Sequence, residues 1–330
     1  MLALRSRVVP LLGVFLGAPV TAEYLQAYLS FTGDPWASVG GVIFFAPLYG
    51  GAALLIREIA VRTGRGWSGV LLLAAAFGVA MPGVIDLAMF GAERADVSYW
   101  AELREPTLIE PLGISAAATL SWTIGHVMMS IGAPLALLHA LAPAHRNRPL
   151  LGKVGMPLTG MAFAAVAIVV HQDGQETYGY SLSVGQVVAV LAVVGVLAGT
   201  AFTGLGAPLQ AKQAGEGVPA ALVVIFAAVL KVAIDLLPPT WIGLASTMAI
   251  LVAAGALVHH AAVHHRWGAR EIGLLGAGVV IGGILIGFAS PVPEGVSAAA
   301  KIAQSSTLLA LALLVLTLVL RRTPDSARHS

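Results

Sequence analysis

Apolar residues run along the chain in ten long stretches, separated by short segments rich in glycine, proline and charge. A helix needs about 20 mostly apolar residues to cross the hydrocarbon core of a bilayer. The ten stretches therefore predict ten spanning helices in one transmembrane domain that covers residues 1–330. Their boundaries are 8–29, 39–61, 67–90, 114–141, 154–172, 184–205, 218–237, 241–263, 272–289 and 298–320.

Composition agrees with this pattern. Of 330 residues, 58% are hydrophobic and 10% are charged, and the mean hydropathy is +0.89, whereas soluble domains carry about 25% charged residues. We therefore expect an all-α, polytopic integral membrane protein whose surroundings are the lipid bilayer. The absence of any long basic run argues against a nucleic-acid partner. The absence of cysteine excludes disulfides and thiolate chemistry, and the sequence predicts no cofactor.

The basic residues predict the orientation. If the N-terminus is cytoplasmic, the inner loops and helix ends hold Arg5, Arg7, Arg57, Arg62, Arg65, Arg146, Arg148, Lys153, Lys212, Arg266, Arg270, Arg321, Arg322 and Arg328. The outer loops hold two, Arg94 and Arg104. Lysine and arginine favour the cytoplasmic side, so we expect both termini inside and the protein in the cytoplasmic membrane, as in a bacterial inner membrane.

The first apolar stretch has a second interpretation. Residues 1–22 have a basic start, an apolar run and small residues at Val20 and Ala22, as in a cleaved signal peptide. The apolar run continues past Glu23 into Tyr24 and Leu25, which favours a retained first helix.

Glycines four residues apart recur in two predicted helices. The pairs are Gly195 and Gly199, Gly278 and Gly282, and Gly283 and Gly287. Small residues at this spacing allow helix backbones to approach closely in lipid. Close packing within the bundle is the favoured interpretation; a glycine-lined pathway or a homo-oligomer contact through these helices is the alternative.

Ionisable residues inside the predicted spans are candidate sites, because burying them in a membrane is costly. Six fall in the outer half or at outer helix ends: Glu23, Asp86, His171, Lys231, Asp235 and Lys301. Pro19 and Pro82 precede Glu23 and Asp86 by four residues, and proline bends helices. We therefore predict an outward-facing polar cavity in which Glu23 and Asp86 meet Lys231 or Lys301 and bind a small solute or ion.

Alternatives remain for several of these residues. Asp86, Asp235, His171 and Lys301 could simply reach the headgroup region. Lys231 precedes Asp235 by four residues, the weaker order for a helical ion pair. We therefore interpret Asp235 as interfacial and expect Lys231 to balance Glu23 or Asp86.

Two further histidine positions carry candidate chemistry. His126, near the predicted midplane, is a weak catalytic candidate or a core histidine bonded to a carbonyl. His260 and His264 are one helical turn apart and are weak metal candidates, with Glu271 as the nearest acid; zinc needs a third or fourth ligand, so an interfacial basic patch is favoured and no metal is predicted.

Arg57 and Glu58 are interpreted as an interfacial anchor together with Arg62, with a phosphate or headgroup site as the alternative. The long outer segment 91–113 could cover the polar cavity, because Tyr99 and Trp100 suit the membrane interface.

Two stretches resemble the CPBP/CAAX-type intramembrane protease and bacteriocin-immunity family. They are "FGVAMPGVIDLAMF", residues 77–90, and "GHVMMSIGAPLALLHAL", residues 125–141. Members of that family carry a double glutamate in one helix and histidines in later helices, which activate a water. His126 matches a family histidine, but Met81 and Pro82 stand where the double glutamate would be. The resemblance therefore implies a non-catalytic relative.

These observations predict transport of a small solute or ion through the outer polar cavity, with proton or cation coupling at Glu23 and Asp86. The alternatives are an intramembrane protease-like protein centred on His126, or an immunity-type membrane protein without turnover.

Overall fold

The computed structural model describes residues 2–94, 97–210 and 216–322, and this part of the chain is mostly helical, with almost no strand. Its helices in the first half are α1 (Leu2–Pro19), η1 (Val20–Tyr24), α2 (Pro35–Phe45), η2 (Ala46–Gly50), α3 (Gly51–Arg62), α4 (Trp67–Ala80), η3 (Met81–Ile85), α5 (Trp100–Arg104), η4 (Glu105–Thr107), η5 (Glu110–Leu112), α6 (Ala116–Gly125), η6 (His126–Gly132) and α7 (Ala133–Leu141). Those in the second half are η7 (Pro143–His145), α8 (Gly155–Tyr178), α9 (Val184–Ala201), η8 (Gly204–Gly206), α10 (Ala220–Leu236), α11 (Trp241–His264), α12 (Ala269–Ala289) and α13 (Ala298–Leu320). Strands β1 (Leu108–Ile109) and β2 (Ile114–Ser115) form one short antiparallel pair. Lys212 and Arg328, which entered the predicted orientation, lie outside the described residues, as does the side chain of Arg5.

Eight of the ten predicted segments contain helices long and apolar enough to cross a membrane, so the protein is a multi-pass, membrane-embedded helical protein. The two remaining segments are also helical: α1 with η1, and α10, which has 17 residues. Several predicted boundaries are wrong. The first helix runs from Leu2 to Tyr24 rather than over 8–29, and the fifth continues to Tyr178. The third ends at Ile85 rather than at residue 90, because the backbone takes a left-handed conformation at Leu87 (φ 65°).

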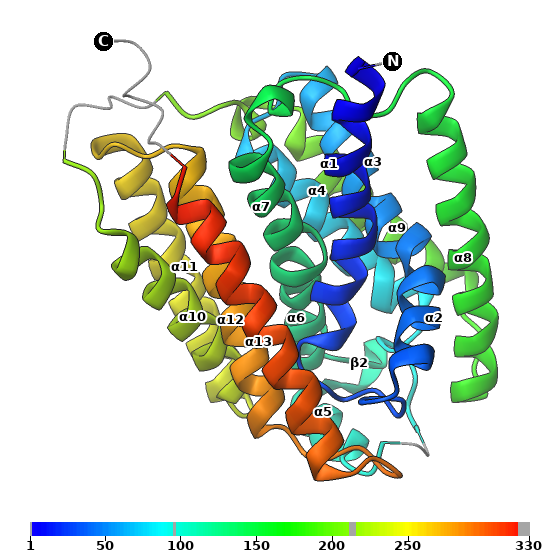
Figure 1. Ribbon diagram of the computed structural model, residues 1–330. Helices are drawn as coiled ribbons and strands as arrows, with labels where there is room; N and C mark the ends of the chain where they lie inside the picture. The colour runs from blue at the N-terminus through cyan, green and yellow to red at the C-terminus, as the bar shows by residue number, and fades with distance from the viewer. Residues whose placement is uncertain (1, 95–96, 211–215, 323–330) are drawn as a thin grey trace.

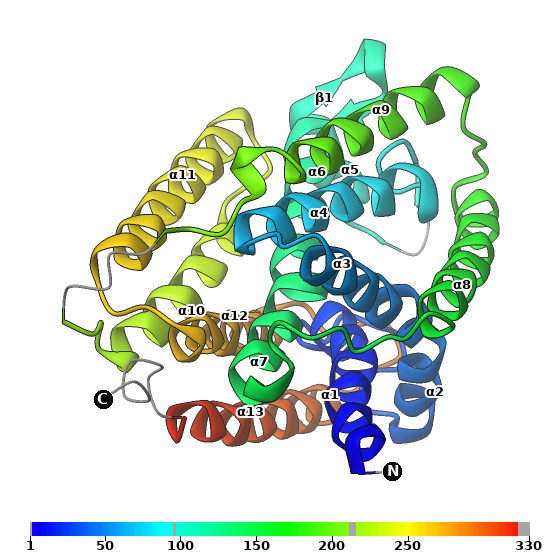
Figure 2. The same ribbon diagram turned by 90° about the horizontal axis from the view of Figure 1, so that it is seen from above.

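Helix α12 lies at the centre of the second half of the bundle, where it packs against α10, α7 and α13 (Figures 1 and 2). In the other half, α9 packs on α4, and α8 lies at the edge against α3 and η2. Helix α13 ends toward the end of the bundle at which α1 begins (Figure 1), where Arg322 donates to the carbonyl of Leu141. We call this the N-terminal end.

The glycine prediction is confirmed in α12 and wrong in α9. A Cβ added at Gly282 would lie 2.7 Å from the carbonyl oxygen of Ala228 on α10, and one at Gly283 would lie 3.2 Å from Met129. Glycine is therefore what lets α12 approach its neighbours. A Cβ at Gly195 or Gly199 would meet nothing within 4 Å, because both lie on the exposed face of α9.

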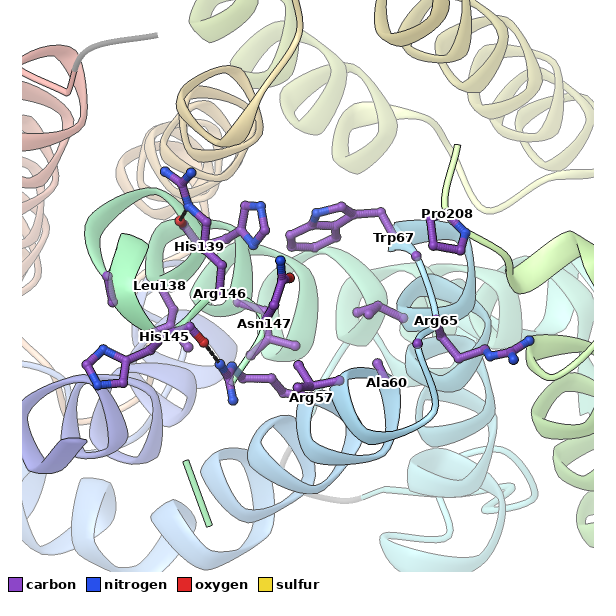
Figure 3. Close-up of a pocket in the computed structure, with 16 residues that line it drawn as sticks. Arg57, Ala60, Arg65, Trp67, Leu138, His139, His145, Arg146, Asn147 and Pro208 are labelled. Carbon is purple, nitrogen blue, oxygen red and sulfur yellow. Dashed lines mark hydrogen bonds between the residues drawn. The ribbon is translucent and has the colours of Figure 1, made fainter. Parts of the chain in front are cut away.

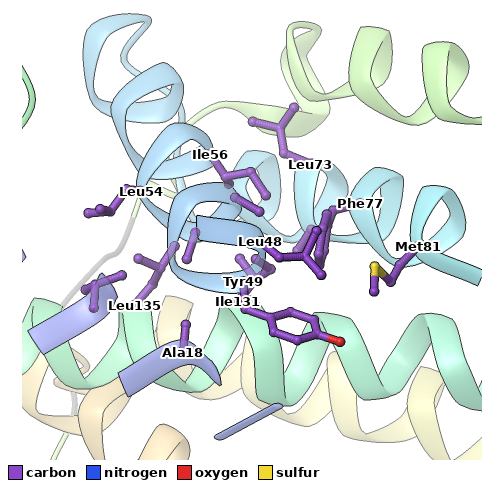
Figure 4. Close-up of a cluster of buried hydrophobic side chains, with 14 of the residues drawn as sticks. Ala18, Leu48, Tyr49, Leu54, Ile56, Leu73, Phe77, Met81, Ile131 and Leu135 are labelled. Carbon is purple, nitrogen blue, oxygen red and sulfur yellow. The ribbon is translucent and has the colours of Figure 1, made fainter. Parts of the chain in front are cut away.

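The largest apolar core joins the first three spanning units to η6. Leu48, Phe77, Met81 and Ile131 are buried there with Ala18 from α1 (Figure 4). The first predicted segment is thus an integral part of the helical bundle. Met81, which the resemblance described above sets against a double glutamate, belongs to this apolar core.

Four π-helical segments interrupt the spanning helices: η1, η2, η3 and η6. Pro19 immediately precedes η1, and Pro47 and Pro82 lie within η2 and η3. Proline cannot donate the regular helical hydrogen bond, so the ladder slips at these points. The predicted distortions at Pro19 and Pro82 are confirmed.

Candidate functional site

Three of the π-helical segments, η1, η2 and η6, line one cavity of about 390 Å³, and Asp86, which directly follows η3, also lines it; the cavity lies toward the end of the bundle opposite the N-terminal end. Five ionisable residues predicted from the sequence line it. They come from four different spanning units and are Glu23, Asp86, His126, Lys231 and Asp235. Segments far apart along the chain therefore bring their buried charged groups to one place.

Glu23 lies in η1 with 8% of its surface exposed. Its two carboxylate oxygens accept hydrogen bonds from different hydroxyls: Oε1 from Tyr49 of η2 and Oε2 from Tyr28. An ionised carboxylate accepts hydrogen bonds and donates none, so the two tyrosines fix the orientation of its charge toward the cavity.

His126 begins η6 and adjoins this arrangement. Its ring stacks on Tyr49, with ring centroids 5.9 Å apart, and meets the edge of Phe77 at 5.5 Å. Its Nδ1 lies 2.9 Å from the hydroxyl of Ser130, one turn further along the segment. The histidine thus has a side-chain partner rather than the carbonyl partner expected of a core histidine.

Asp86 lies where η3 ends. Its Oδ1 accepts from the backbone N–H of Ala88 at 2.9 Å and closes the turn in which Leu87 takes a left-handed conformation. A non-glycine residue in that region is uncommon and strained. Asp86 therefore stabilises the helix end and also lines the cavity.

The expected role of Lys231 is wrong. Its ammonium group pairs with Asp235 on the same face of α10, and Asp235 also accepts from Gln26 Nε2 at 2.9 Å. Lys231 is almost completely buried, so it takes the nearest carboxylate on its own helix instead of Glu23 or Asp86. Asp235, a predicted site residue that was also interpreted as interfacial, lies on the cavity wall.

Two predicted outer residues lie outside this cavity lining. Lys301 is buried near the start of α13 and donates to the carbonyl of Ser290, so it ties α13 to the end of α12. His171 Nδ1 lies 3.0 Å from the carbonyl of Val84 in η3. The prediction that Lys301 faces Glu23 and Asp86 is therefore wrong.

Part of the segment 91–113 lies on the cavity wall, which agrees with its predicted place beside the cavity. Val97, Tyr99 and Trp100 contribute to its lining, and the Arg94 guanidinium lies 5.6 Å from the centre of the Trp100 ring. Arg104 holds the segment in place by donating to the carbonyls of Met89 and Gly113, at 3.2 and 3.0 Å. Burial lowers the pKa of Arg104 from its usual value.

Sequence reasoning missed the neutral partners. Tyr28, Tyr49 and Gln26 were not considered because they carry no charge, and yet they hold the carboxylates of Glu23 and Asp235. The position of Pro47 in the sequence could have pointed to Tyr49. It is another proline inside an apolar stretch, like Pro19 and Pro82, and Tyr49 follows it by two residues.

The histidine pair on α11 gains no third ligand. The rings of His260 and His264 lie 4.6 Å apart, but Glu271 accepts from the Gly268 N–H at the start of α12. Among the described residues, no group of three His, Asp or Glu side chains is placed to hold a metal ion.

Arg57 and Glu58, interpreted from the sequence as an interfacial anchor, form a buried network near the end of α3. Glu58 is fully buried; it pairs with Arg57 at 3.0 Å and Arg62 at 3.3 Å, and accepts from the Leu150 N–H at 2.6 Å. The two arginines also donate to carbonyls of the loop after α7, at His145, Arg148 and Leu151. The network therefore fixes this loop onto α3.

No family model, curated protein or solved structure matches this chain. The proposed function therefore rests on the cavity itself.

Proposed function

We propose that the protein carries a small polar solute or an ion across the membrane, with proton coupling at Glu23 and Asp86. One observation supports this most strongly: a membrane-embedded helical chain gathers six charged or histidine side chains on the wall of one cavity, the five predicted ones and Arg94. Such groups are costly within a bilayer and mark substrate or ion pathways. Interrupted helices that end at a binding site are also a recurrent feature of transporters.

Glu23 is the coupling residue in this proposal. When ionised, it accepts from both Tyr28 and Tyr49. On protonation one oxygen becomes a donor, so one tyrosine hydroxyl must turn and accept. Because Tyr49 also stacks on His126, proton uptake at Glu23 changes a hydrogen bond within the cavity wall itself.

The orientation follows from the positive-inside bias. With ten spans, the N-terminal end faces the cytoplasm and the cavity opens outward. Helix α10, with 17 residues, extends about 26 Å at 1.5 Å per residue, close to the hydrocarbon thickness of about 30 Å. The protein then resides in the cytoplasmic membrane as one domain with both termini inside.

Proton flux through purified protein tests the proposal. Proteoliposomes that enclose a pH-sensitive dye receive a potassium diffusion potential with valinomycin, and internal pH is followed with a panel of small polar solutes outside. We expect a solute-dependent proton flux in the wild type and its loss in Glu23→Gln, which removes the titrating group and keeps the side-chain shape.

Glu294→Gln is the matched control, because Glu294 is exposed in the loop between α12 and α13. It makes the same chemical change away from the cavity and is expected to leave the flux unchanged. An equal flux in Glu23→Gln and wild type would refute the role of Glu23.

A second function is favoured by the presence of His126 on the same cavity as three carboxylates. If the resemblance to CPBP/CAAX-type proteases reflects ancestry, His126 and Glu23 would be the groups left to activate a water. The apolar Met81 argues for a non-catalytic descendant. Cleavage of a membrane-embedded peptide by wild type, abolished in His126→Ala, would establish hydrolysis; absence of cleavage by wild type would exclude it for that substrate.

A further inference from the structure

The cavities at the two ends of the bundle differ in the charged groups that line them. The one at the N-terminal end, of about 460 Å³, lies between the α3–α4 turn and the segment after α7, and its lining includes Arg57 and Arg146 (Figure 3). No carboxylate is among its lining residues, all of which the structure describes. Acidic side chains instead line the cavity of about 390 Å³ around Glu23, which we call the Glu23 cavity.

The formal charges on the wall of the Glu23 cavity do not cancel. Its lining contains three carboxylates and two cationic groups, which belong to Glu23, Asp86, Asp235, Lys231 and Arg94. Three negative and two positive charges leave a formal charge of −1, with His126 neutral and with Arg94 counted as a full positive charge. An occupant with one positive charge would balance this wall.

Two of the three carboxylates have no cation in direct contact. Asp235 is paired with Lys231, so these two side chains neutralise each other. Within the described part of the chain, Glu23 and Asp86 bond only to neutral donors, which are two tyrosine hydroxyls and one backbone N–H. These donors orient the two carboxylates at the cavity and leave their negative charge for an occupant.

Aromatic rings are concentrated on the same wall. Five of its 22 lining residues are tyrosine or tryptophan, namely Tyr28, Tyr49, Tyr99, Trp100 and Trp122, whereas aromatic residues make up 7% of the chain. The guanidinium groups of Arg94 and Arg104 lie 5.6 and 5.9 Å from the centre of the Trp100 ring. Aromatic faces attract cations, so these rings suit a cation that also carries apolar groups.

An inorganic ion fits this wall less well. Calcium takes about six to eight oxygen ligands, but both oxygens of Glu23 and one of Asp86 already accept hydrogen bonds. In residues 2–94, 97–210 and 216–322, no group of three His, Asp or Glu side chains is placed to hold a metal ion. The cavity volume also lies within the range of about 300–1,000 Å³ that is typical of small-molecule sites.

We propose that the Glu23 cavity binds a small organic cation with one positive charge, an alkylated ammonium compound, with its nitrogen near Glu23 and Asp86 and its alkyl groups against the aromatic rings. An alkylated nitrogen has few or no N–H groups, so it needs negative charge more than free acceptor oxygens. Aromatic rings recognise quaternary ammonium groups in this way. This inference rests on the proposed transport function, because it names the class of solute for the same cavity.

Isothermal titration calorimetry of the detergent-solubilised full chain can test the site. Choline is compared with 3,3-dimethylbutan-1-ol, which has the same shape with an uncharged carbon in place of the nitrogen. We expect choline to bind at least about tenfold more tightly, because its charge meets both the carboxylates and the rings. Sodium chloride at the same ionic strength should not displace choline.

Glu23→Gln and Asp86→Asn each remove one negative charge and keep the shape of the side chain. Each is expected to weaken choline binding about tenfold or more, because an unscreened charge is lost beside the ligand. Glu294→Gln is the matched control: Glu294 is exposed in the loop between α12 and α13 and outside the cavity lining, and its substitution should leave the affinity unchanged.

Trp122 tests the contribution of the rings. Trp122→Leu is expected to weaken choline binding about threefold or more, whereas Trp122→Phe keeps a ring and should retain more of the affinity. Trp36→Leu is the matched control, because Trp36 is 85% exposed at the start of α2 and outside the cavity lining. Equal affinities for choline in Trp122→Leu and Trp36→Leu would contradict the role of the rings.

Four results would overturn the assignment to an organic cation. They are no measurable binding of choline, equal binding of choline and its carbon isostere, displacement of choline by sodium, or equal effects of Glu23→Gln and Glu294→Gln. Thermal stability of every variant in the same detergent shows whether a lost affinity is due to unfolding.

Proton flux in proteoliposomes separates this inference from the transport proposal. Choline binding without any solute-dependent flux would refute transport and retain the cation site. Flux with a neutral solute, together with no binding of choline, would refute the organic cation and retain transport.

Discussion

Glu58 and Glu23 are both buried carboxylates in spanning segments, one toward each end of the bundle, and their surroundings differ. Glu58 is fully buried and bonded to two arginines and a backbone N–H, and those arginines end on loop carbonyls. Glu23 is held by two neutral tyrosine hydroxyls and faces a cavity.

The difference separates two uses of buried charge. Around Glu58, opposite charges and carbonyls neutralise and occupy the group, so its contribution is to stability. Around Glu23, the hydrogen-bond donors are neutral hydroxyls, which orient the carboxylate toward a cavity whose wall also carries Arg94. A proton or a cation in the cavity can therefore compensate its charge. Four predictions challenge this comparison, in order of decreasing effect on the free energy of unfolding.

Glu58→Gln is expected to have the largest effect. It leaves Arg57 buried without its counter-charge, and it replaces the carboxylate that accepts from the Leu150 N–H with a neutral amide. Removing one partner of a buried ion pair costs about 3–5 kcal/mol. Titration with SDS in mixed micelles, followed by circular dichroism, measures the unfolding free energy. Glu294→Gln should stay within about 0.5 kcal/mol of wild type, and similar values for the two variants would contradict the structural role of Glu58.

Asp235→Asn comes next, at about 3 kcal/mol, because it removes the charge that balances the buried Lys231. Lys231→Met should cost less, since Asp235 keeps its bond from Gln26 and is 15% exposed. In the double variant the two costs should not add, because the buried ammonium is gone. Additive losses in the same SDS titration would show that the pair does not act as a unit.

Gly282→Ala should cost about 1–3 kcal/mol through overpacking, because the new methyl group would lie 2.7 Å from the Ala228 carbonyl and 2.9 Å from Lys231 Cβ. Gly195→Ala is the matched control in open space and should be neutral or stabilising by up to about 1 kcal/mol. A larger loss at position 195 than at position 282 would contradict the close approach of α12 to α10.

Glu23→Gln should have the smallest effect, about 1 kcal/mol or less, because the amide can still accept from one tyrosine and donate to the other. The same variant should lose proton flux. A loss of stability as large as that of Glu58→Gln would mean that Glu23 has a structural role and would remove the distinction between the two carboxylates.

The sequence alone was sufficient for the class of protein and for most of the helices. Runs of about 20 apolar residues have one common solution in lipid, because every backbone polar group must be bonded within its own segment. The same argument picked out Glu23, Asp86, Lys231 and Asp235 as costly residues, and Pro19 and Pro82 as distortions. All six positions were assigned without knowledge of their neighbours.

Only the tertiary structure decided which buried groups meet. Helix spacing places Lys231 beside Asp235 in any α-helix, but whether either also reaches Glu23 depends on how α1 and α10 pack. That packing depends on Gly282 and Gly283, because their lack of a side chain allows the neighbouring segments to approach α12 closely. Tyr49 became part of the site because η2 turns it toward η1, and Lys301 was excluded because α13 turns it toward Ser290. Apolar length is a local property of the chain, whereas the partner of a buried charge is set by contacts between segments distant in sequence.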